Sequence, residues 1–194
     1  MEYALEILGT LVGLIYLWLE YRASIYLWIA SVIMPAIYIF VYYEAGLYAD
    51  FAINIYYLGA AVYGWLVWRY APKPKEQKEL PITKMPKRLW LKASVVFLIA
   101  QFLIAWLLIN FTDSDVPGWD AFTTALSIIG MWMLARKYLE QWLVWIVVDV
   151  VCVGLYLYKG LYFTSGLYAL YSVIAVFGWL NWKKLMKSVS SGLY

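Results

Sequence analysis

Long apolar runs separated by short polar breaks dominate the chain. The runs lie near residues 4–19, 25–43, 47–68, 89–110, 121–135, 141–158 and 161–182. A transmembrane helix needs about 20 predominantly apolar residues. Several of the runs meet tight breaks such as YEAG at 43–46 and YKG at 158–160, which are typical of helical hairpins with very short turns. The pattern therefore predicts an all-α integral membrane protein with seven transmembrane helices.

The largest break in this pattern is APKPKEQKELPITKMPKR, residues 71–88. Its prolines and charges are incompatible with the hydrocarbon of a bilayer, so we interpret it as a solvated linker. Composition favours a tether that also fixes the topology of the helices. The alternative is a segment that docks a partner.

Composition narrows the classes of function. Of the 194 residues 65% are hydrophobic and 14% charged, against about 25% charged in a soluble domain, so no sizeable soluble domain is expected. Cys152 is the single cysteine and there is no histidine, which excludes internal disulfides and argues against Cys/His metal sites and Cys–His catalysis. No phosphate-binding loop and no basic stripe for nucleic acid is found. We predict no enzymatic activity, metal, cofactor or nucleic-acid partner.

The basic residues indicate how the chain crosses the bilayer. If the 71–88 linker is cytoplasmic and the helices alternate in direction, 14 of the 15 Lys and Arg residues lie on the cytoplasmic side and only Lys159 lies outside. This asymmetry agrees with the positive-inside rule and predicts an external N-terminus and a cytoplasmic C-terminus. The first residues, MEYALEILGT, carry acids where a secretory signal carries bases, so cleavage is not expected.

A repeat with a constant offset of 114 residues runs through the chain. It aligns GWLVWR (64–69) with GWLNWK (178–183). Without a gap, the same offset pairs Trp18 with Trp132, Arg22 with Arg136, Trp28 with Trp142, Tyr42 with Tyr156, Gly46-Leu47-Tyr48 with Gly160-Leu161-Tyr162, and Tyr57 with Tyr171. Matched Trp, Arg and Gly at one offset predict two homologous units of three helices each.

The charge pattern fixes the relation between these units. Three helices reverse the direction of the chain, yet matched basic residues fall on the same side, so a further helix at 89–110 must restore the direction. The predicted order is a first repeat at 1–69, a cytoplasmic loop at 70–88, a linker helix at 89–110, a second repeat at 111–187 and a tail at 188–194. Such a 3+1+3 arrangement of parallel repeats is typical of transporters, with the substrate near the midplane between the repeats.

Asp149 is the most informative polar residue. It lies mid-run in WLVWIVVDVVCVGLY, where a carboxylate costs about 2.5–3.5 kcal/mol on insertion scales. Trp145, Cys152 and Tyr156 share its helix face, and Pro35 is its repeat match. A substrate-binding role is the favoured interpretation, with a structural hydrogen bond as the alternative.

Two matched helix faces are rich in aromatic residues, which hold delocalised cations by roughly 0.5–2 kcal/mol each. The alternative is packing against lipid and an interfacial belt. The first face carries Asn54, Tyr57, Ala61, Trp65 and Trp68, and the second carries Tyr168, Tyr171, Ala175, Trp179 and Trp182. Weaker candidates are Asn181, which replaces Val67 of the first repeat and is turned away from Trp179, and the hydroxyls of Thr124 and Ser127, which more often bond within their own helix.

The phrases MPAIY, AGLYAD, NIYY, EQWLVWIVVDVV and YKGLYFTS, together with the repeat and the Trp-x-x-Trp ends, resemble the Pnu family of vitamin transporters along nearly the whole chain. The resemblance implies a SWEET-like fold of seven helices, a homotrimer in the bacterial inner membrane, and facilitated diffusion of a vitamin that a cytoplasmic kinase then phosphorylates. It places the family's tryptophan-pair motif at Trp65/Trp68 and Trp179/Trp182, with the substrate cavity between the repeats.

The expected substrate is a flat cation. The phrases AGLYAD and WIVVDVVC look closest to thiamin-type PnuT members, and one deep carboxylate among many rings suits thiamin. Nicotinamide riboside, the substrate of PnuC members, is the alternative within the family, and a flavin is less favoured. From another class, a membrane scaffold protein without transport stays open, with Asp149 bonded to a neighbouring helix.

Overall fold

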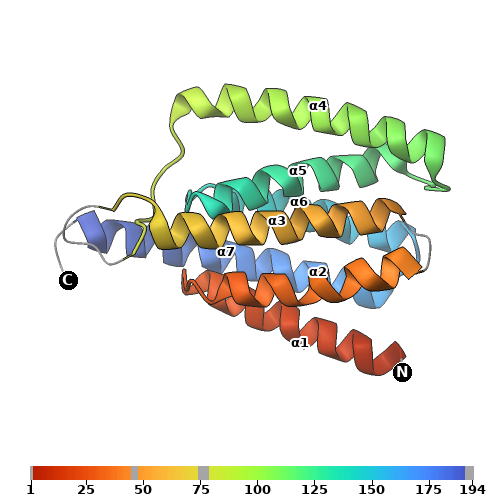
Figure 1. Cartoon of the computed structure of the whole chain (residues 1–194), viewed down its shortest axis with the longest axis horizontal. Coiled ribbons are helices and arrows are strands. Elements are labelled where there is room, and N and C mark those ends of the chain that lie inside the picture. Colours follow the sequence, from red (N-terminus) through yellow and green to blue (C-terminus); the bar gives the residue numbers. More distant parts are fainter. Residues whose placement is uncertain (1, 45–47, 74–78, 191–194) are drawn as a thin grey trace. The chain divides into compact units, whose positions relative to one another are not determined.

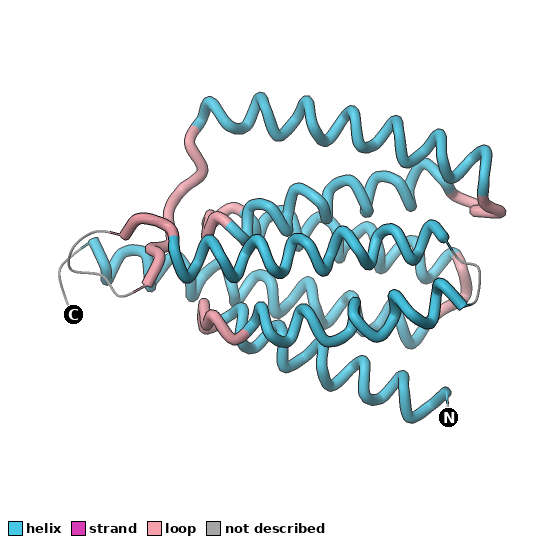
Figure 2. The backbone as a smooth tube through the Cα atoms, viewed as in Figure 1, coloured by secondary structure: helices cyan, strands magenta, loops and turns pink. Residues whose placement is uncertain are grey.

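The computed structural model describes residues 2–44, 48–73 and 79–190. Within them the chain forms seven helices, and Figures 1 and 2 show helix along most of this length. Their bounds are α1 (Glu2–Tyr21), α2 (Leu27–Glu44), α3 (Tyr48–Tyr70), α4 (Lys87–Phe111), α5 (Pro117–Ala135), α6 (Gln141–Tyr158) and α7 (Tyr162–Ser190). Each apolar run corresponds to one helix. Residues 45–47, which the repeat includes, lie outside the described part.

The described residues include helices with the length and hydropathy of a membrane span. In the described ranges there are three: Lys87–Phe111, Gln141–Tyr158 and Tyr162–Ser188. Leu11–Tyr21 and Leu27–Ile37 are shorter apolar helical stretches within the described residues. The all-helical prediction is confirmed. The seven-span prediction is supported to the extent of these three helices.

The chain divides into two compact units. The first comprises Met1–Pro81, Ala135–Lys137 and Lys184–Tyr194. In it, α2 packs against both α1 and α3. The ring of Trp28 on α2 lies against Gly64 of α3, where a Cβ would collide with it. Trp28 also meets Trp68 edge to face, with ring centroids 5.5 Å apart, so a glycine and two tryptophans fix how α2 and α3 approach each other.

The second unit comprises Ile82–Leu134 and Tyr138–Lys183, and it repeats this packing. Trp142 of α6 lies against Gly178 of α7, where a Cβ would come within 2.6 Å of the ring. Trp142 meets Trp182 edge to face at 5.7 Å. These three residues stand 114 positions after Trp28, Gly64 and Trp68. The repeat found in the sequence therefore has the same helix contact in each unit.

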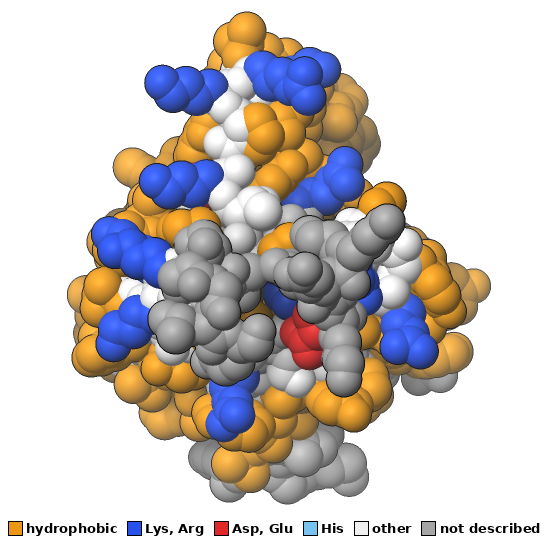
Figure 3. Space-filling view, turned by 90° about the vertical axis from the view of Figure 1, so that its left-hand side faces the viewer, with side chains coloured by type: hydrophobic (Ala, Val, Ile, Leu, Met, Phe, Trp, Pro, Cys, Tyr) orange, Lys and Arg blue, Asp and Glu red, His pale blue; other side chains and the backbone are white. Residues whose placement is uncertain are grey.

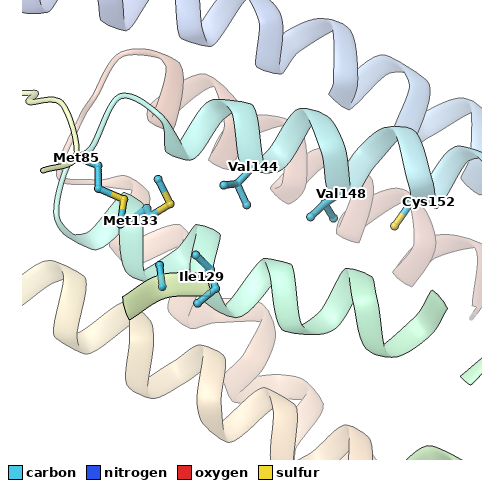
Figure 4. Packing of buried hydrophobic residues seen from close by; sticks show 7 residues of the cluster. Met85, Ile129, Met133, Val144, Val148 and Cys152 are labelled. Atoms are coloured by element: carbon cyan, nitrogen blue, oxygen red, sulfur yellow. The ribbon is translucent and has the colours of Figure 1, made fainter. Parts of the chain in front are cut away.

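An apolar cluster holds α5 and α6 of the second unit together. In Figure 4, Val144, Val148 and Cys152 point from successive turns of α6 toward α5. Because lipid is as apolar as these side chains, van der Waals packing stabilises this contact within a bilayer. The buried members of the cluster are Met85, Ala93, Ile129, Met133, Val144, Val148 and Cys152.

The turns that join the first two helices of each repeat have matching backbones. Ala23 and Lys137 both have positive φ, 51° and 56°. The next residue donates back to the helix in both cases, Ser24 to the Leu19 carbonyl at 2.9 Å and Tyr138 to the Met133 carbonyl at 3.0 Å. This is the Schellman end of a helix, with Ala and Lys where glycine is usual.

The segment after α3 differs from the solvated tether that we predicted. Ile82 and Met85 are buried. The Leu139 amide donates to the Thr83 carbonyl at 2.9 Å, and the Met85 amide donates to the Glu140 carboxylate at 2.9 Å. The spacing of Ile82 and Met85 lets both apolar side chains bury while the lysines between and after them stay exposed. Residues 82–85 are therefore docked on the turn before α6.

Ionic contacts lie at the helix ends of the second unit. At the start of α5, Asp120 accepts from the Lys159 ammonium at 2.9 Å and from the Ser114 hydroxyl at 2.6 Å. This joins the start of α5 to the turn between α6 and α7.

Lysine and arginine side chains, blue in Figure 3, stand out among hydrophobic side chains on the face shown there. The bodies of the helices are apolar, as the sequence predicted.

Candidate functional site

Asp149 occupies the middle of α6 and is 7% exposed. In the described ranges, no lysine or arginine forms an ion pair with it. Its two immediate buried neighbours on the helix face, Val148 and Cys152, belong to the apolar cluster. A carboxyl group so placed is costly to keep unless a ligand or a polar partner meets it.

Tyrosines of α7 lie around this carboxyl group. Tyr168 and Tyr171 both interact electrostatically with Asp149. The rings of Tyr156 and Tyr168 are stacked, with centroids 5.1 Å apart, and their hydroxyl groups are hydrogen-bonded. Tyr171 packs its ring against Tyr168 at 5.6 Å. The second unit thus gathers one carboxyl group and three tyrosine rings on facing sides of α6 and α7.

Trp145 lies one helical turn before Asp149 and is half-buried. Its ring packs on α5, where a Cβ at Gly130 would lie 3.2 Å from it. The indole N–H is buried and meets no acceptor in the part of the chain that the structure describes. Trp145 therefore offers a ring and a free donor close to Asp149, as the helix spacing predicted.

The predicted site residues of α3 belong to the first unit. Asn54 and Tyr57 are half-buried, and the Tyr57 ring lies 5.7 Å from that of Tyr56. Ala61 is fully buried, as is its repeat match Ala175. These residues share a face of α3, and their participation in a substrate site remains a prediction.

Within each of the two tryptophan pairs, the two rings lie in different environments. Trp68 and Trp182 are buried and pack edge to face on Trp28 and Trp142. Their contacts are those of helix packing. Trp65, by contrast, is 38% exposed, and Trp179, which is half-buried, holds the Lys183 ammonium 4.8 Å from its ring centroid. The first tryptophan of each pair is the one left accessible.

The weaker candidates are placed as follows. The Thr124 hydroxyl donates to the Asp120 carbonyl at 2.8 Å, and the Ser127 hydroxyl donates to the Thr123 carbonyl at 2.7 Å. Both bonds lie within α5, the usual arrangement for such residues. Asn181 is half-buried on α7. The hydroxyl groups of Thr124 and Ser127 are therefore hydrogen-bonded without a ligand.

Lys137 is a residue whose environment sequence reasoning missed, because it was counted only as a topological charge. It is 3% exposed, lies 3.5 Å from the Glu79 carboxylate, and sits 4.2 Å from the centroid of the Trp68 ring. Burial lowers the pKa of Lys137 to about 8, and Glu79 opposes that shift. The sequence offered one indication of this burial, because Lys137 stands where the first repeat has an apolar residue, Ala23.

Gln141 is the second residue that was missed. It begins α6 and is fully buried, and neither its Oε1 nor its Nε2 atom meets a hydrogen-bond partner within the described residues. Its repeat match is Leu27, which is also fully buried. The substitution of an amide for leucine in an apolar place is visible once the two repeats are aligned.

The arrangement offers the groups of a binding site. Among the described residues, no three His, Cys, Asp or Glu side chains come together to hold a metal ion. What α6 and α7 offer is one buried carboxyl group, unpaired donors and stacked rings. Such a set can orient a flat, hydrogen-bonding or cationic solute.

Residues 3–184 match the family described as nicotinamide mononucleotide transporter. The chain belongs to that family. The resemblance to Pnu transporters is therefore confirmed, and the apolar helices agree with a multi-pass membrane transporter.

Individual relatives agree with this assignment. The chain is 26% identical to the nicotinamide riboside transporter PnuC of Escherichia coli (strain K12), over 91% of this chain and 85% of that one. It is 24% identical to the riboflavin/roseoflavin transporter RibM of Streptomyces davaonensis, over 91% and 83% of the two chains. A crystal structure of the vitamin B3 transporter PnuC matches with a TM-score of 0.68 and 23% identity, over 92% of this chain and 80% of that one, which shows a shared fold.

Proposed function

We propose that the chain carries nicotinamide riboside across the bacterial inner membrane by facilitated diffusion. Two of the relatives described above are named for nicotinamide riboside or for vitamin B3, and one for riboflavin. None of these names supports thiamin, which our interpretation of the sequence favoured. The nicotinamide riboside alternative is the better supported one, and the transporter names count against a scaffold protein.

The observation that carries this proposal is the buried Asp149 beside the tyrosines of α7. Nicotinamide riboside has a pyridinium ring with a delocalised positive charge. A carboxylate that lacks a basic partner in the described residues provides the counter-charge, and tyrosine and tryptophan rings provide stacking surfaces. The ribose hydroxyl groups can also donate hydrogen bonds to this carboxylate.

The wider arrangement follows from the repeat. We propose that the equivalent Trp–Gly–Trp contacts of the two units belong to parallel three-helix repeats, with α4 as the linking helix. In α4, no residue of the apolar membrane-length window is buried, which suits a helix that faces lipid or a neighbouring subunit. Under this proposal the N-terminus is external and the basic ends are cytoplasmic. A homotrimer, and a cytoplasmic kinase that traps the product, are further parts of the proposal.

Uptake of labelled nicotinamide riboside into proteoliposomes tests the function. We expect uptake that dissipated ion gradients do not change, and competition by unlabelled nicotinamide riboside but not by thiamin. Asp149→Asn should lower uptake at least about tenfold, because losing about 1.4 kcal/mol of charge interaction changes affinity by that factor. Asp115→Asn is the matched control, since Asp115 is an exposed acid.

Two results would contradict the proposal. One is uptake no greater than that of empty vesicles, and the other is full competition by thiamin at concentrations where nicotinamide riboside competes weakly. Competition by riboflavin alone would instead assign the chain to the substrate for which RibM is named.

A further inference from the structure

Gln141 is a polar side chain that the fold holds at a cost. It is fully buried at the first residue of α6. In the described part of the chain, its carbonyl oxygen accepts no hydrogen bond and its NH₂ group donates none. A buried amide without partners is rare in native structures, because both groups lose their bonds to water. Such a group requires an explanation.

The first repeat shows that the fold does not need an amide here. Leu27 occupies the matched position at the start of α2 and is equally buried. The backbones agree, since the Leu27 amide donates to the Ser24 carbonyl at 3.1 Å and the Gln141 amide donates to the Tyr138 carbonyl at 3.2 Å. A leucine therefore fills this place in the same kind of turn. The turn itself does not require the glutamine.

The position of Gln141 on its helix connects it with the candidate site. Gln141, Trp145 and Asp149 follow each other at intervals of four residues, so they lie on one face of α6. Their Cα atoms span about 12 Å along the helix axis, a distance comparable with the length of a nucleoside. Side chains on a helix lean toward its N-terminus, which brings the Asp149 carboxyl group closer to Trp145.

The three side chains have complementary chemistry. Gln141 offers one acceptor and two donors, Trp145 offers an aromatic face and an indole N–H without an acceptor among the described residues, and Asp149 offers a carboxyl group. The remaining residues of this stretch of the face, Val144 and Val148, point toward α5 (Figure 4). The polar groups on this stretch of α6 thus match a ligand that has an amide at one end and hydroxyl groups at the other.

We propose that Gln141 recognises the carboxamide of nicotinamide riboside and selects it against the corresponding carboxylic acid. This proposal rests on the proposed function. A carboxamide has the same donor and acceptor pair as glutamine, so the two form two hydrogen bonds head to head. Nicotinic acid riboside presents a carboxylate, which accepts only. The carbonyl oxygen of Gln141 would stay unpaired against it, the kind of mismatch that gives a polar site its selectivity.

The test compares Gln141→Leu, which copies the first repeat, with wild type in detergent. Titration calorimetry with nicotinamide riboside and with nicotinic acid riboside gives the affinity ratio, and thermal unfolding without ligand gives stability. We expect the variant to unfold at the wild-type temperature or higher, because an unpaired buried amide has been removed. Its affinity for nicotinamide riboside should fall on the order of 10–100-fold, while weak binding of the acid stays unchanged, so the ratio falls toward one.

Leu27→Met is the matched control, because it changes the equivalent buried position of the first repeat without adding a polar group. It should alter neither the affinity ratio nor the unfolding temperature appreciably. Gln141→Met, a second apolar replacement, should repeat the loss of selectivity seen with leucine.

Each contrary outcome has its own meaning. If Gln141→Leu and Gln141→Met unfold at lower temperature or fail to fold, or keep the wild-type ratio, Gln141 is a structural residue and the inference is wrong. If wild type binds neither riboside, the proposed function fails and the inference fails with it. If wild type binds nicotinamide riboside and both variants bind it equally well, only the inference fails.

Discussion

The turn that ends α1 and the turn that ends α5 share a backbone but differ in chemistry. Both have a residue with positive φ, Ala23 and Lys137, and both lead into a helix whose second residue is a buried tryptophan, Trp28 and Trp142. Around that common frame the first turn carries Ala23, Tyr26 and Leu27, and the second carries Lys137, Glu140 and Gln141.

This difference shows that a repeated unit can change its polar side chains without changing its fold. Helix ends and the tryptophan–glycine contact are set by backbone geometry and packing, and these are kept. In the second turn, the Glu140 carboxylate accepts from the Met85 amide and the Lys137 ammonium lies over the Trp68 ring. The Gln141 amide is unpaired within the described residues. In the second repeat, Asp149 also stands in place of Pro35.

The largest effect should come from removing the shared tryptophans. Trp28→Ala and Trp142→Ala each delete a fully buried ring that packs on a glycine and on a second tryptophan. We expect each to lower the free energy of unfolding by about 3–5 kcal/mol, measured by thermal unfolding in detergent. Trp106→Ala, which removes a 54% exposed ring, should cost much less. A loss in only one of the two variants would show that the packing is not equivalent.

Titration of Lys137 should distinguish the second turn from the first. Burial lowers its pKa from an ordinary 10.5 to about 8. Glu79 opposes this shift, and Lys73 adds to it. Between those values the unfolded chain holds the proton and the folded chain does not, so stability should rise as pH increases from 8 to 10.5. The full gain is on the order of 3 kcal/mol.

Thermal unfolding at several pH values checks this. In Lys137→Met the rise should disappear, because no group at that site titrates. Lys92→Met, which removes an exposed lysine, should leave the profile of wild type. A wild-type stability that falls between pH 8 and 10 would mean that the Lys137 charge stabilises the folded state.

A smaller effect should follow from loosening the segment docked on the second turn. Glu140→Gln replaces the carboxylate that accepts from the Met85 amide and should weaken this bond by about 1 kcal/mol. Trypsin should then cleave faster after Lys84 and Lys87, which are exposed on either side of the buried Met85. Tyr26→Phe, at the matched position of the first turn, should not change cleavage. Equal cleavage in Glu140→Gln and wild type would show that the bond does not hold the segment.

Local patterns predicted the helices, and tertiary contacts decided what was missed. The run at 141–158 gave the bounds of α6 without error because apolar length and a polar break are local properties. Helix α7 continues to Ser190, into the stretch 188–194 that we predicted as a tail. The docking of residues 82–85 depends on partners more than fifty positions away, which composition does not reveal.

The candidate site was predicted in the same uneven way. Helix spacing placed Trp145 and Asp149 on one face, and the 114-residue repeat identified the matched tryptophans. Spacing alone did not separate Trp68 and Trp182, which pack on other tryptophans, from Trp65 and Trp179, which stay more accessible. Gln141 was missed because a glutamine beside a charged turn gives no sign of burial until Leu27 is compared with it.

The smallest effect tests the backbone that the two turns share. Ala23 has a φ of 51°, which costs an L-residue about 1–2 kcal/mol. Ala23→Gly removes that strain, but it also removes a buried methyl group worth about 0.8 kcal/mol and adds about 0.4–1 kcal/mol of unfolded-chain entropy. These terms nearly cancel, so the free energy of unfolding should change by less than about 1 kcal/mol. Ala23→Val keeps the methyl and adds β-branching, which the left-handed conformation tolerates poorly, so it should be destabilised by more than about 1 kcal/mol. If the valine variant is as stable as the glycine variant, Ala23 does not hold a left-handed conformation, and the two turns are less alike than their hydrogen bonds indicate.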